Sequence, residues 1–153
     1  MNRKLFGVAL TLIFAAVALA VPAAAQTARV SVPSQKNFEQ TVNQLKSSVA
    51  QGGMMIMATV DQGNMLSMTG LKLKATLFLV GNPTVGKKIF EQTHAAGLYL
   101  PLRVFVYEDN NGKTYVSYDK PSSLLAQFRN AEVDQTAAML DQKLDGLVHM
   151  VTQ

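Results

Sequence analysis

The chain has no cysteine and only two histidines among its 153 residues. Without cysteine it can form no disulfide, so burial of apolar side chains must hold the fold together. His94 and His149 lie far apart and form no His-x-x-x-His or Glu-x-x-His pair, which argues against a structural zinc site. No serine lies in the Gly-x-Ser-x-Gly pattern, so nucleophilic catalysis has no recognisable carrier. Internal repeats, linkers and low-complexity tracts are absent as well.

The first 25 residues have the pattern of a secretory signal peptide. Residues 2–4 are Asn-Arg-Lys, residues 5–21 are an apolar run, and residues 23–25 are alanines that fit small-x-small cleavage. An uncleaved membrane anchor is the alternative, but the run is short for a span and the alanines suit a signal peptidase. We expect cleavage after Ala25, a periplasmic or secreted protein, and no membrane span after cleavage.

The net charge does not favour nucleic acid as a partner. The whole chain has a formal charge of +4, but loss of Arg3 and Lys4 leaves 12 basic against 10 acidic residues, a charge of +2. A balance this small does not create the basic surface typical of nucleic-acid binding. Residues 26–153 are enough for a single domain with one core.

Hydrophobic spacing after the leader predicts both strands and helices. Alternation predicts strands over 28–33, 54–61, 71–80, 100–108 and 113–118. Spacings of three and four predict amphipathic helices over 35–50 and 132–151, with further helices over 85–96 and 121–128. A break is expected at 62–64, a hairpin turn at Asp109-Asn110-Asn111-Gly112, and a helix N-cap at Ser34. This order predicts an α+β domain, a β-α-β(4)-α-like antiparallel sheet with its helices packed on one face.

Four motifs follow one another between Phe78 and Pro121. They are Gly81-Asn82-Pro83, Leu100-Pro101-Leu102, the acidic hairpin turn, and Tyr118-x-x-Pro121. In this order they resemble the domain of unknown function 302 family (DUF302), and the similarity covers most of the chain after the leader. The resemblance implies a fold similar to the TATA-binding-protein-like arrangement, and it implies no settled activity. Fold analogy alone carries no argument for DNA binding.

The chain departs from that family at the end of the second strand. The family usually has an Asp-His pair there, whereas this chain reads Asp61-Gln62. Any base or metal role of that histidine would be lost in this protein. We therefore expect Asp61 to cap a turn after the strand.

The segment from Gly81 to Lys88 matches the start of a phosphate-binding loop, G-x-x-x-x-G-K. Lys88 stands where such a loop needs Ser or Thr to hold magnesium, and Pro83 removes one backbone N–H. The sequence therefore does not predict an ATPase. A small anion at the helix start beside Lys87 and Lys88 is a weaker alternative, and a plain strand-to-helix turn is preferred to it.

Five of the eight methionines lie between residues 54 and 68. Thioethers can bind Cu(I), and on a strand Met55 and Met57 share a face. No histidine lies beside this cluster, and such methionines are more often flexible filler of a core. No cofactor or metal is therefore predicted, with copper at Met55 and Met57 as the alternative.

One sheet face is expected to lie uncovered. We place the leucines of residues 71–79 with Leu102, Val104 and Val106 under the helices, which leaves aromatic rings and Arg103 on the opposite face. That surface is too apolar to face water without a partner. A homodimer interface is preferred, a pocket for a small apolar or anionic ligand comes next, and single-stranded nucleic acid is disfavoured by export. The residues of the uncovered face are Lys74, Thr76, Phe78, Arg103, Phe105, Tyr107, Tyr115 and Ser117.

The sequence thus favours an exported small binding or interaction module, a homodimer that uses the open sheet face. Its predicted ligand or interface residues are Phe78, Asn82, Arg103, Phe105, Tyr107 and Tyr118. The alternative is an enzyme of unknown reaction that uses Asp61, Arg103, Tyr107 and Tyr118, or a Met-rich copper-binding protein. An enzyme would need at least two of these polar groups to converge in a concave pocket with a shifted pKa.

Overall fold

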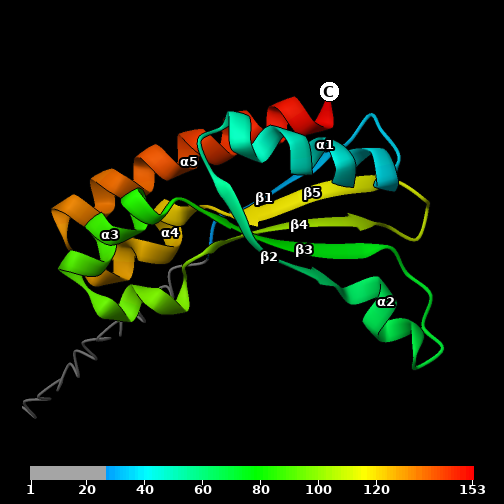
Figure 1. The fold of residues 1–153 in the computed structure, drawn as a ribbon, viewed down its shortest axis with the longest axis horizontal. Helices are drawn as coiled ribbons and strands as arrows, with labels where there is room; N and C mark the ends of the chain where they lie inside the picture. The colour runs from blue at the N-terminus through cyan, green and yellow to red at the C-terminus, as the bar shows by residue number, and fades with distance from the viewer. Residues whose placement is uncertain (1–26) are drawn as a thin grey trace, which may run out of the picture.

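The computed structural model describes residues 27–153. The predicted signal peptide and its cleavage after Ala25 lie outside the described residues. Five strands form one antiparallel sheet in the order β1-β5-β4-β3-β2, so β4 is the central strand (Figure 1). Their bounds are β1 Arg29–Pro33, β2 Met55–Asp61, β3 Ala75–Gly81, β4 Leu102–Glu108 and β5 Thr114–Asp119.

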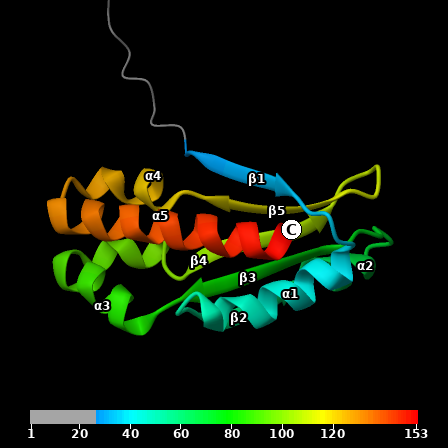
Figure 2. The same ribbon diagram turned by 90° about the horizontal axis from the view of Figure 1, so that it is seen from above.

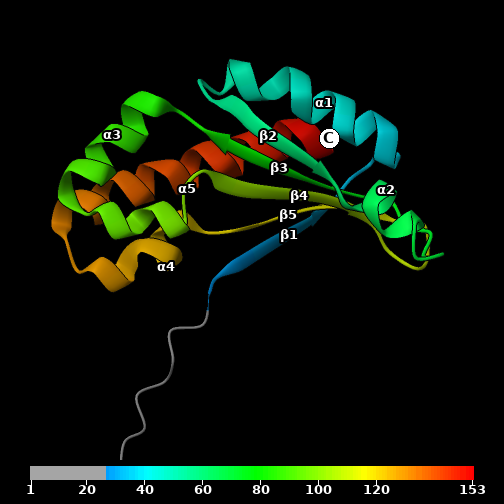
Figure 3. The same ribbon diagram turned by 60° about the horizontal axis from the view of Figure 1, so that its bottom comes forward.

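The long helices cover one face of this sheet, which we call the helix side. Seen from above, α1 and α5 lie across it, while α3 and α4 gather at one end around the first half of α5 (Figure 2). No described element covers most of the opposite face, and α2 projects from the far end of β2 (Figure 3). The predicted α+β fold is thus confirmed. The helices are α1 Phe38–Gln51, α2 Gln62–Ser67, α3 Pro83–Gln92, α4 Pro121–Leu125 and α5 Ala131–Thr152, with 3-10 turns at His94–Leu98 and Ala126–Phe128.

The core lies between the sheet and the two long helices. Leu45 of α1 and Leu144 of α5 are fully buried against the valines of the central strands, Val104, Val106 and Val116. Val104 and Val106 alternate with partly or fully exposed residues along β4, because successive strand side chains point to opposite faces. The prediction that Val104 and Val106 lie under the helices is therefore confirmed.

We predicted that Ser34 would cap the N-terminus of α1, but the structure shows that Asn37 is the cap. The Asn37 side chain accepts a hydrogen bond from the Gln40 backbone N–H at 2.9 Å, and Gln40 Oε1 accepts one from the Asn37 backbone N–H at 3.3 Å. This reciprocal pair satisfies two backbone donors that the helix leaves unpaired. Ser34 is instead buried, with its hydroxyl 2.9 Å from that of Thr41.

The connection between β2 and β3 differs from the prediction. The expected break at 62–64 is the start of α2, whose N-cap is Asp61: its Oδ1 accepts the Asn64 N–H at 2.9 Å. The predicted capping role of Asp61 is thus confirmed. Gly63 permits the next turn, because a Cβ there would lie 2.5 Å from the Leu73 carbonyl oxygen. Strand β3 begins only at Ala75, so Leu71 and Leu73 lie in an exposed connection.

The face assignment of β3 was wrong. Phe78 pairs with Val104 and is 0% exposed, so it points to the helix side, whereas Leu77 pairs with Phe105 on the opposite face. Both alternating sets of β3 are apolar, so alternation alone could not choose between them. The prediction followed the leucine series back to Leu71, which is outside the strand.

Two polar residues that we predicted on the open face, Thr76 and Lys74, also lie on the helix side. Thr76 shares the orientation of Phe78 and is buried. Lys74 precedes β3 and its ammonium lies 3.3 Å from Glu39 of α1 and 3.4 Å from Glu108. The exposed face of the sheet therefore carries leucines in place of the predicted lysine and threonine.

Candidate functional site

The uncovered sheet surface, which we call the open face, is fixed by the strand register. One row crosses four strands from Leu77 through Phe105 and Ser117 to Ser31, and a neighbouring row joins Tyr107 to Tyr115. Residues two positions apart on each strand share this face. The open face is made of Arg29, Ser31, Val60, Leu77, Leu79, Arg103, Phe105, Tyr107, Tyr115, Ser117 and Asp119.

Three aromatic rings stack at the centre of the open face. The rings of Phe105 and Tyr107 lie 5.2 Å apart at 15°, and those of Tyr107 and Tyr115 lie 5.5 Å apart at 19°. The first pair are alternate residues of β4, and the second pair face each other across β4 and β5. Such neighbours on one sheet face interact directly. The three rings remain partly exposed and form one continuous apolar ridge.

Of the two arginines on the open face, Arg29 is paired with a carboxylate and Arg103, within the described residues, is not. Arg29 binds Asp119 through two hydrogen bonds of 2.8 and 3.2 Å, and this contact raises the pKa of the Arg29 guanidinium. Arg103 is exposed and has no hydrogen-bond or ion-pair partner within residues 27–153. Together with Leu77, Phe105 and Tyr107 these side chains border a shallow hollow of about 390 Å³. The open face thus combines apolar rings with one cation that is available for a partner.

Tyr118, one of the predicted interface residues, lies on the other side of the sheet. It is 3% exposed, and its hydroxyl donates a hydrogen bond to Asp145 of α5. Burial, and next this hydrogen bond, raise the pKa of the Tyr118 hydroxyl above its ordinary value. Tyr118 is one of the residues that border the hollow, but its side chain belongs to the buried core. The interface prediction is therefore wrong for Tyr118, as it is for the buried Phe78.

The Tyr118-x-x-Pro121 motif joins β5 to α5. Beyond Tyr118, the backbone N–H and the hydroxyl of Ser122 both donate to Asp141, at 2.9 and 2.5 Å. Asp141 and Asp145 are four residues apart and therefore lie on the same face of α5. The motif thus fixes the corner between the sheet and the last helix.

Asn82 has a structural role at the start of α3. Its Oδ1 accepts the N–H groups of Thr84 and Val85 at 2.9 and 3.3 Å, and its Nδ2 donates to the Gly53 carbonyl at 2.8 Å. Pro83 has no N–H to offer, and the Gly86 N–H bonds to the Asn82 carbonyl at 2.8 Å. The helix start therefore has no free N–H group for an anion, which is the geometry of the plain strand-to-helix turn.

The two lysines of the anion prediction lie on the exposed surface of α3. The Lys87 ammonium is 3.5 Å from Glu91, its neighbour one turn later, and the Lys87 side chain is 72% exposed. Lys88 is exposed as well. The two cations of the predicted anion site at Lys87 and Lys88 are thus present on the surface, but the N-terminus of α3 offers an anion no free N–H group.

Of the four polar groups of the enzyme alternative, Arg103 and Tyr107 border the same hollow, but the hydroxyl of Tyr118 and the carboxylate of Asp61 are engaged elsewhere. Arg103 and Tyr107 lie on the open face, the Tyr118 hydroxyl is bonded to α5, and Asp61 caps α2. Within residues 27–153 no group of three His, Asp or Glu side chains could hold a metal ion. Met55 and Met57 are 55% and 43% exposed, and copper binding by them stays the alternative to the prediction of no metal.

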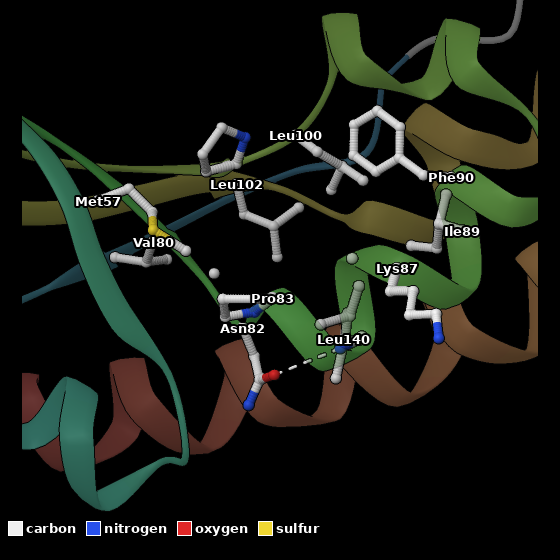
Figure 4. A pocket seen from close by; sticks show the side chains of 14 residues that line it. Met57, Val80, Asn82, Pro83, Lys87, Ile89, Phe90, Leu100, Leu102 and Leu140 are labelled. Atoms are coloured by element: carbon white, nitrogen blue, oxygen red, sulfur yellow. Dashed lines mark hydrogen bonds between the residues drawn. The ribbon is translucent and has the colours of Figure 1, made fainter.

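A second hollow lies at the end of the sheet, between β3, α3 and α5. This apolar cavity of about 260 Å³ is shown in Figure 4. The Gly81-Asn82-Pro83 turn forms one wall, and the Leu100-Pro101-Leu102 segment forms the wall facing it. The labelled lining residues are Met57, Val80, Asn82, Pro83, Lys87, Ile89, Phe90, Leu100, Leu102 and Leu140.

Sequence reasoning missed this cavity, although it singled out both motifs that build it. It considered each motif as a turn or a strand of its own. The available signal was that each motif carries a proline at one end of a predicted strand, the first just after Val80 and the second just after Leu100. β3 and β4 are antiparallel neighbours, so the end of β3 and the start of β4 meet at the same sheet edge.

The chain is similar in sequence to several known proteins. It is 30% identical over 96 residues to the fluoride-specific ion channel FluC 1 of Brucella suis and to that of Brucella abortus. These matches cover 62% of the chain but only 38% and 36% of those relatives, so the chain spans well under half of their length. No helix in the described range 27–153 has the length and apolar character of a membrane span.

A solved structure shows the same fold. The crystal structure of an uncharacterized conserved DUF302 protein from Bacillus stearothermophilus superposes with a TM-score of 0.75 at 21% identity. The similarity covers 80% of this chain and 97% of that one. A family model described as domain of unknown function DUF302 matches residues 30–151, which cover the five strands and both long helices except for Arg29 at the start of β1 and Thr152 at the end of α5. The protein therefore belongs to the DUF302 family.

Proposed function

We propose that this protein is an exported binding module that forms a homodimer through its open face. The observation that carries the proposal is the stack of Phe105, Tyr107 and Tyr115 beside Arg103 on a sheet face that no described helix covers. Contiguous apolar surface of this kind marks an interaction site, and aromatic residues and arginine are enriched in such sites.

The position of the stack favours a second copy of the chain as the partner. Phe105 and Tyr107 lie on β4, the central strand, so a twofold axis through the middle of the open face would bring the same strand of the second copy opposite. In that arrangement Arg103 of each copy can lie over an aromatic ring of the other, a favourable cation–π contact. The open face supplies both the cations and the rings, which makes it self-complementary.

The relatives support the view of this domain as a module. In the Brucella channels the matched segment is 36% to 38% of the polypeptide, so a similar segment occurs there joined to other sequence. Interaction modules are commonly reused in this way. Fluoride transport is the activity in the name of those whole proteins, and we do not propose it for this chain.

Dimerisation is tested by light scattering coupled to size-exclusion chromatography. We expect a dimer for the wild type and a folded monomer for Phe105→Glu, because the substitution buries a carboxylate in the interface. Met139→Glu is the matched control, since Met139 is an exposed apolar residue of α5 on the opposite side of the sheet. It should remain dimeric. A monomeric wild type, or a Phe105→Glu variant that stays dimeric, would refute the proposal.

Export is tested separately by cell fractionation and N-terminal sequencing. We expect the protein in the periplasm or the medium, with Gln26 as its first residue. An intact Met1 in the mature protein, or a protein confined to the cytoplasm, would contradict this part of the proposal and leave the dimer untouched.

A further inference from the structure

The apolar cavity at the end of the sheet is independent of the open face. Val80 and Leu102, which form part of its wall, point to the helix side, where Leu140 of α5 closes it. Two motifs separated by 16 residues, Gly81-Asn82-Pro83 and Leu100-Pro101-Leu102, face each other across it (Figure 4). The polar atoms of Asn82 are turned away from it into the helix cap and to Gly53.

We propose that this cavity is a binding site for a small neutral apolar molecule of about the size of two fused rings. A dry apolar cavity of about 150 Å³ accommodates benzene in an engineered protein, so one of about 260 Å³ has room for a larger ring system. Ligand sites are typically concave and mainly apolar. The proposal goes beyond dimerisation and does not rest on it.

The lining favours a neutral ligand. Lys87 is the one charged residue in the wall of the cavity, and its ammonium lies beside Glu91 on the exposed surface of α3. No other side chain of the wall can compensate a charge that leaves water, and burial of an unpaired charge is strongly unfavourable. A ligand that carries an anionic group should therefore bind more weakly than its neutral parent.

Gly86 offers a way to fill the cavity without disturbing the fold. It lies in the wall of the cavity within α3, and a Cβ added there meets no atom within 4 Å. Gly86→Leu should place its side chain in the cavity, while replacement of a helical glycine favours the helix. Gly146→Leu is the matched control, because Gly146 is an exposed glycine of α5 with equally open surroundings and no part in the cavity.

The experiment is equilibrium dialysis of the purified protein against naphthalene, read from naphthalene fluorescence. We expect saturable binding of one naphthalene per chain by the wild type and by Gly146→Leu, and at least tenfold weaker binding by Gly86→Leu. Naphthalene-1-sulfonate should bind the wild type several-fold more weakly than naphthalene. Phe105→Glu should bind naphthalene like the wild type, which separates this site from the open face.

Several outcomes would overturn the proposal. They are no saturable binding by the wild type, equal binding by Gly86→Leu, loss of binding in Phe105→Glu, or equal affinity for the sulfonate. Circular dichroism and a thermal melt show whether Gly86→Leu is folded. Should it prove unfolded, Gly86→Met, with its unbranched side chain, takes its place under the same criteria.

Discussion

Replacement of Phe78 by alanine tests the orientation of β3, on which the composition of the open face depends. Phe78 is 0% exposed and belongs to the core between the sheet and the helices. Phenylalanine-to-alanine substitutions at such positions lower the free energy of unfolding by about 3–5 kcal/mol. For the 127 described residues the unfolding entropy is about 0.27 kcal/mol/K, so a loss of about 4 kcal/mol should lower the melting temperature by about 15 °C.

The neighbouring residue provides the control. Leu77 is partly exposed on the open face, so Leu77→Ala should lower the free energy of unfolding of the monomer by only about 1 kcal/mol. Both variants are measured by urea denaturation and by thermal melting, at low protein concentration so that assembly contributes little. An equal loss for Leu77→Ala and Phe78→Ala, or a larger one for Leu77→Ala, would refute the orientation of β3 and with it the open face.

Three further predictions concern single interactions. Tyr118→Phe should be less stable than the wild type at neutral pH, since it lacks the hydroxyl that donates to α5. Because the pKa of Tyr118 is raised in the folded protein, this stabilisation should be complete below pH ~10, the ordinary tyrosine value. Above that pH the stabilisation should decline by up to ~1.4 kcal/mol per pH unit. Urea denaturation at several pH values should therefore show the stabilities of the two proteins converging as the pH rises. Asn82→Ala should lower the free energy of unfolding by about 2 kcal/mol, because the helix cap and the bond to Gly53 are both lost. Asn82→Asp keeps the acceptor of the cap, so its free energy of unfolding should lie between those of the wild type and Asn82→Ala in the same urea assay. The double substitution Met55→Leu and Met57→Leu should cost less than about 1.5 kcal/mol, since volume is nearly conserved. Stoichiometric Cu(I) retained by the wild type against a strong chelator, and lost in the double variant, would instead establish a copper site.

The sequence predicted those elements whose pattern is both long and one-sided. The last helix is an example: Val133, Ala137, Leu140, Leu144, Leu147 and Val151 all prove to be buried. The hairpin turn at 109–112 also has the predicted form, with Gly112 in a left-handed conformation at φ 79°. In both cases a local rule was sufficient, because helical spacing or turn chemistry leaves no second solution.

The short helix α2 and the orientation of β3 could not be predicted in that way. In α2 the capping carboxylate of Asp61 and the close approach at Gly63 decide the local structure, and both depend on where the chain returns at Leu73. In β3 both faces carry large apolar residues, so only the register with β4 distinguishes them. A shift of one residue exchanges the two faces of a strand.

The corrected orientation of β3 strengthens the argument for a partner at the open face. The predicted face contained Thr76 and Lys74, which water solvates well, whereas the observed face places Leu77 beside Phe105 and Leu79 beside Arg103. Leucines that flank the aromatic stack enlarge the contiguous apolar surface, and such a surface is unfavourable in water.

The same geometry separates the two proposed sites by chemistry and by position. The open face presents rings and a cation on one side of the sheet, and the cavity is a mainly apolar hollow whose sheet-derived walls point to the helix side. A second copy on the open face would therefore leave the cavity accessible from the end of the sheet. Phe105→Glu and Gly86→Leu should consequently act independently: the double variant should be monomeric and fail to bind naphthalene, with each effect equal to that of its single substitution. Dependence of one effect on the other would show that assembly and the cavity are coupled through β4, which contributes Phe105 to the open face and Leu102 to the cavity.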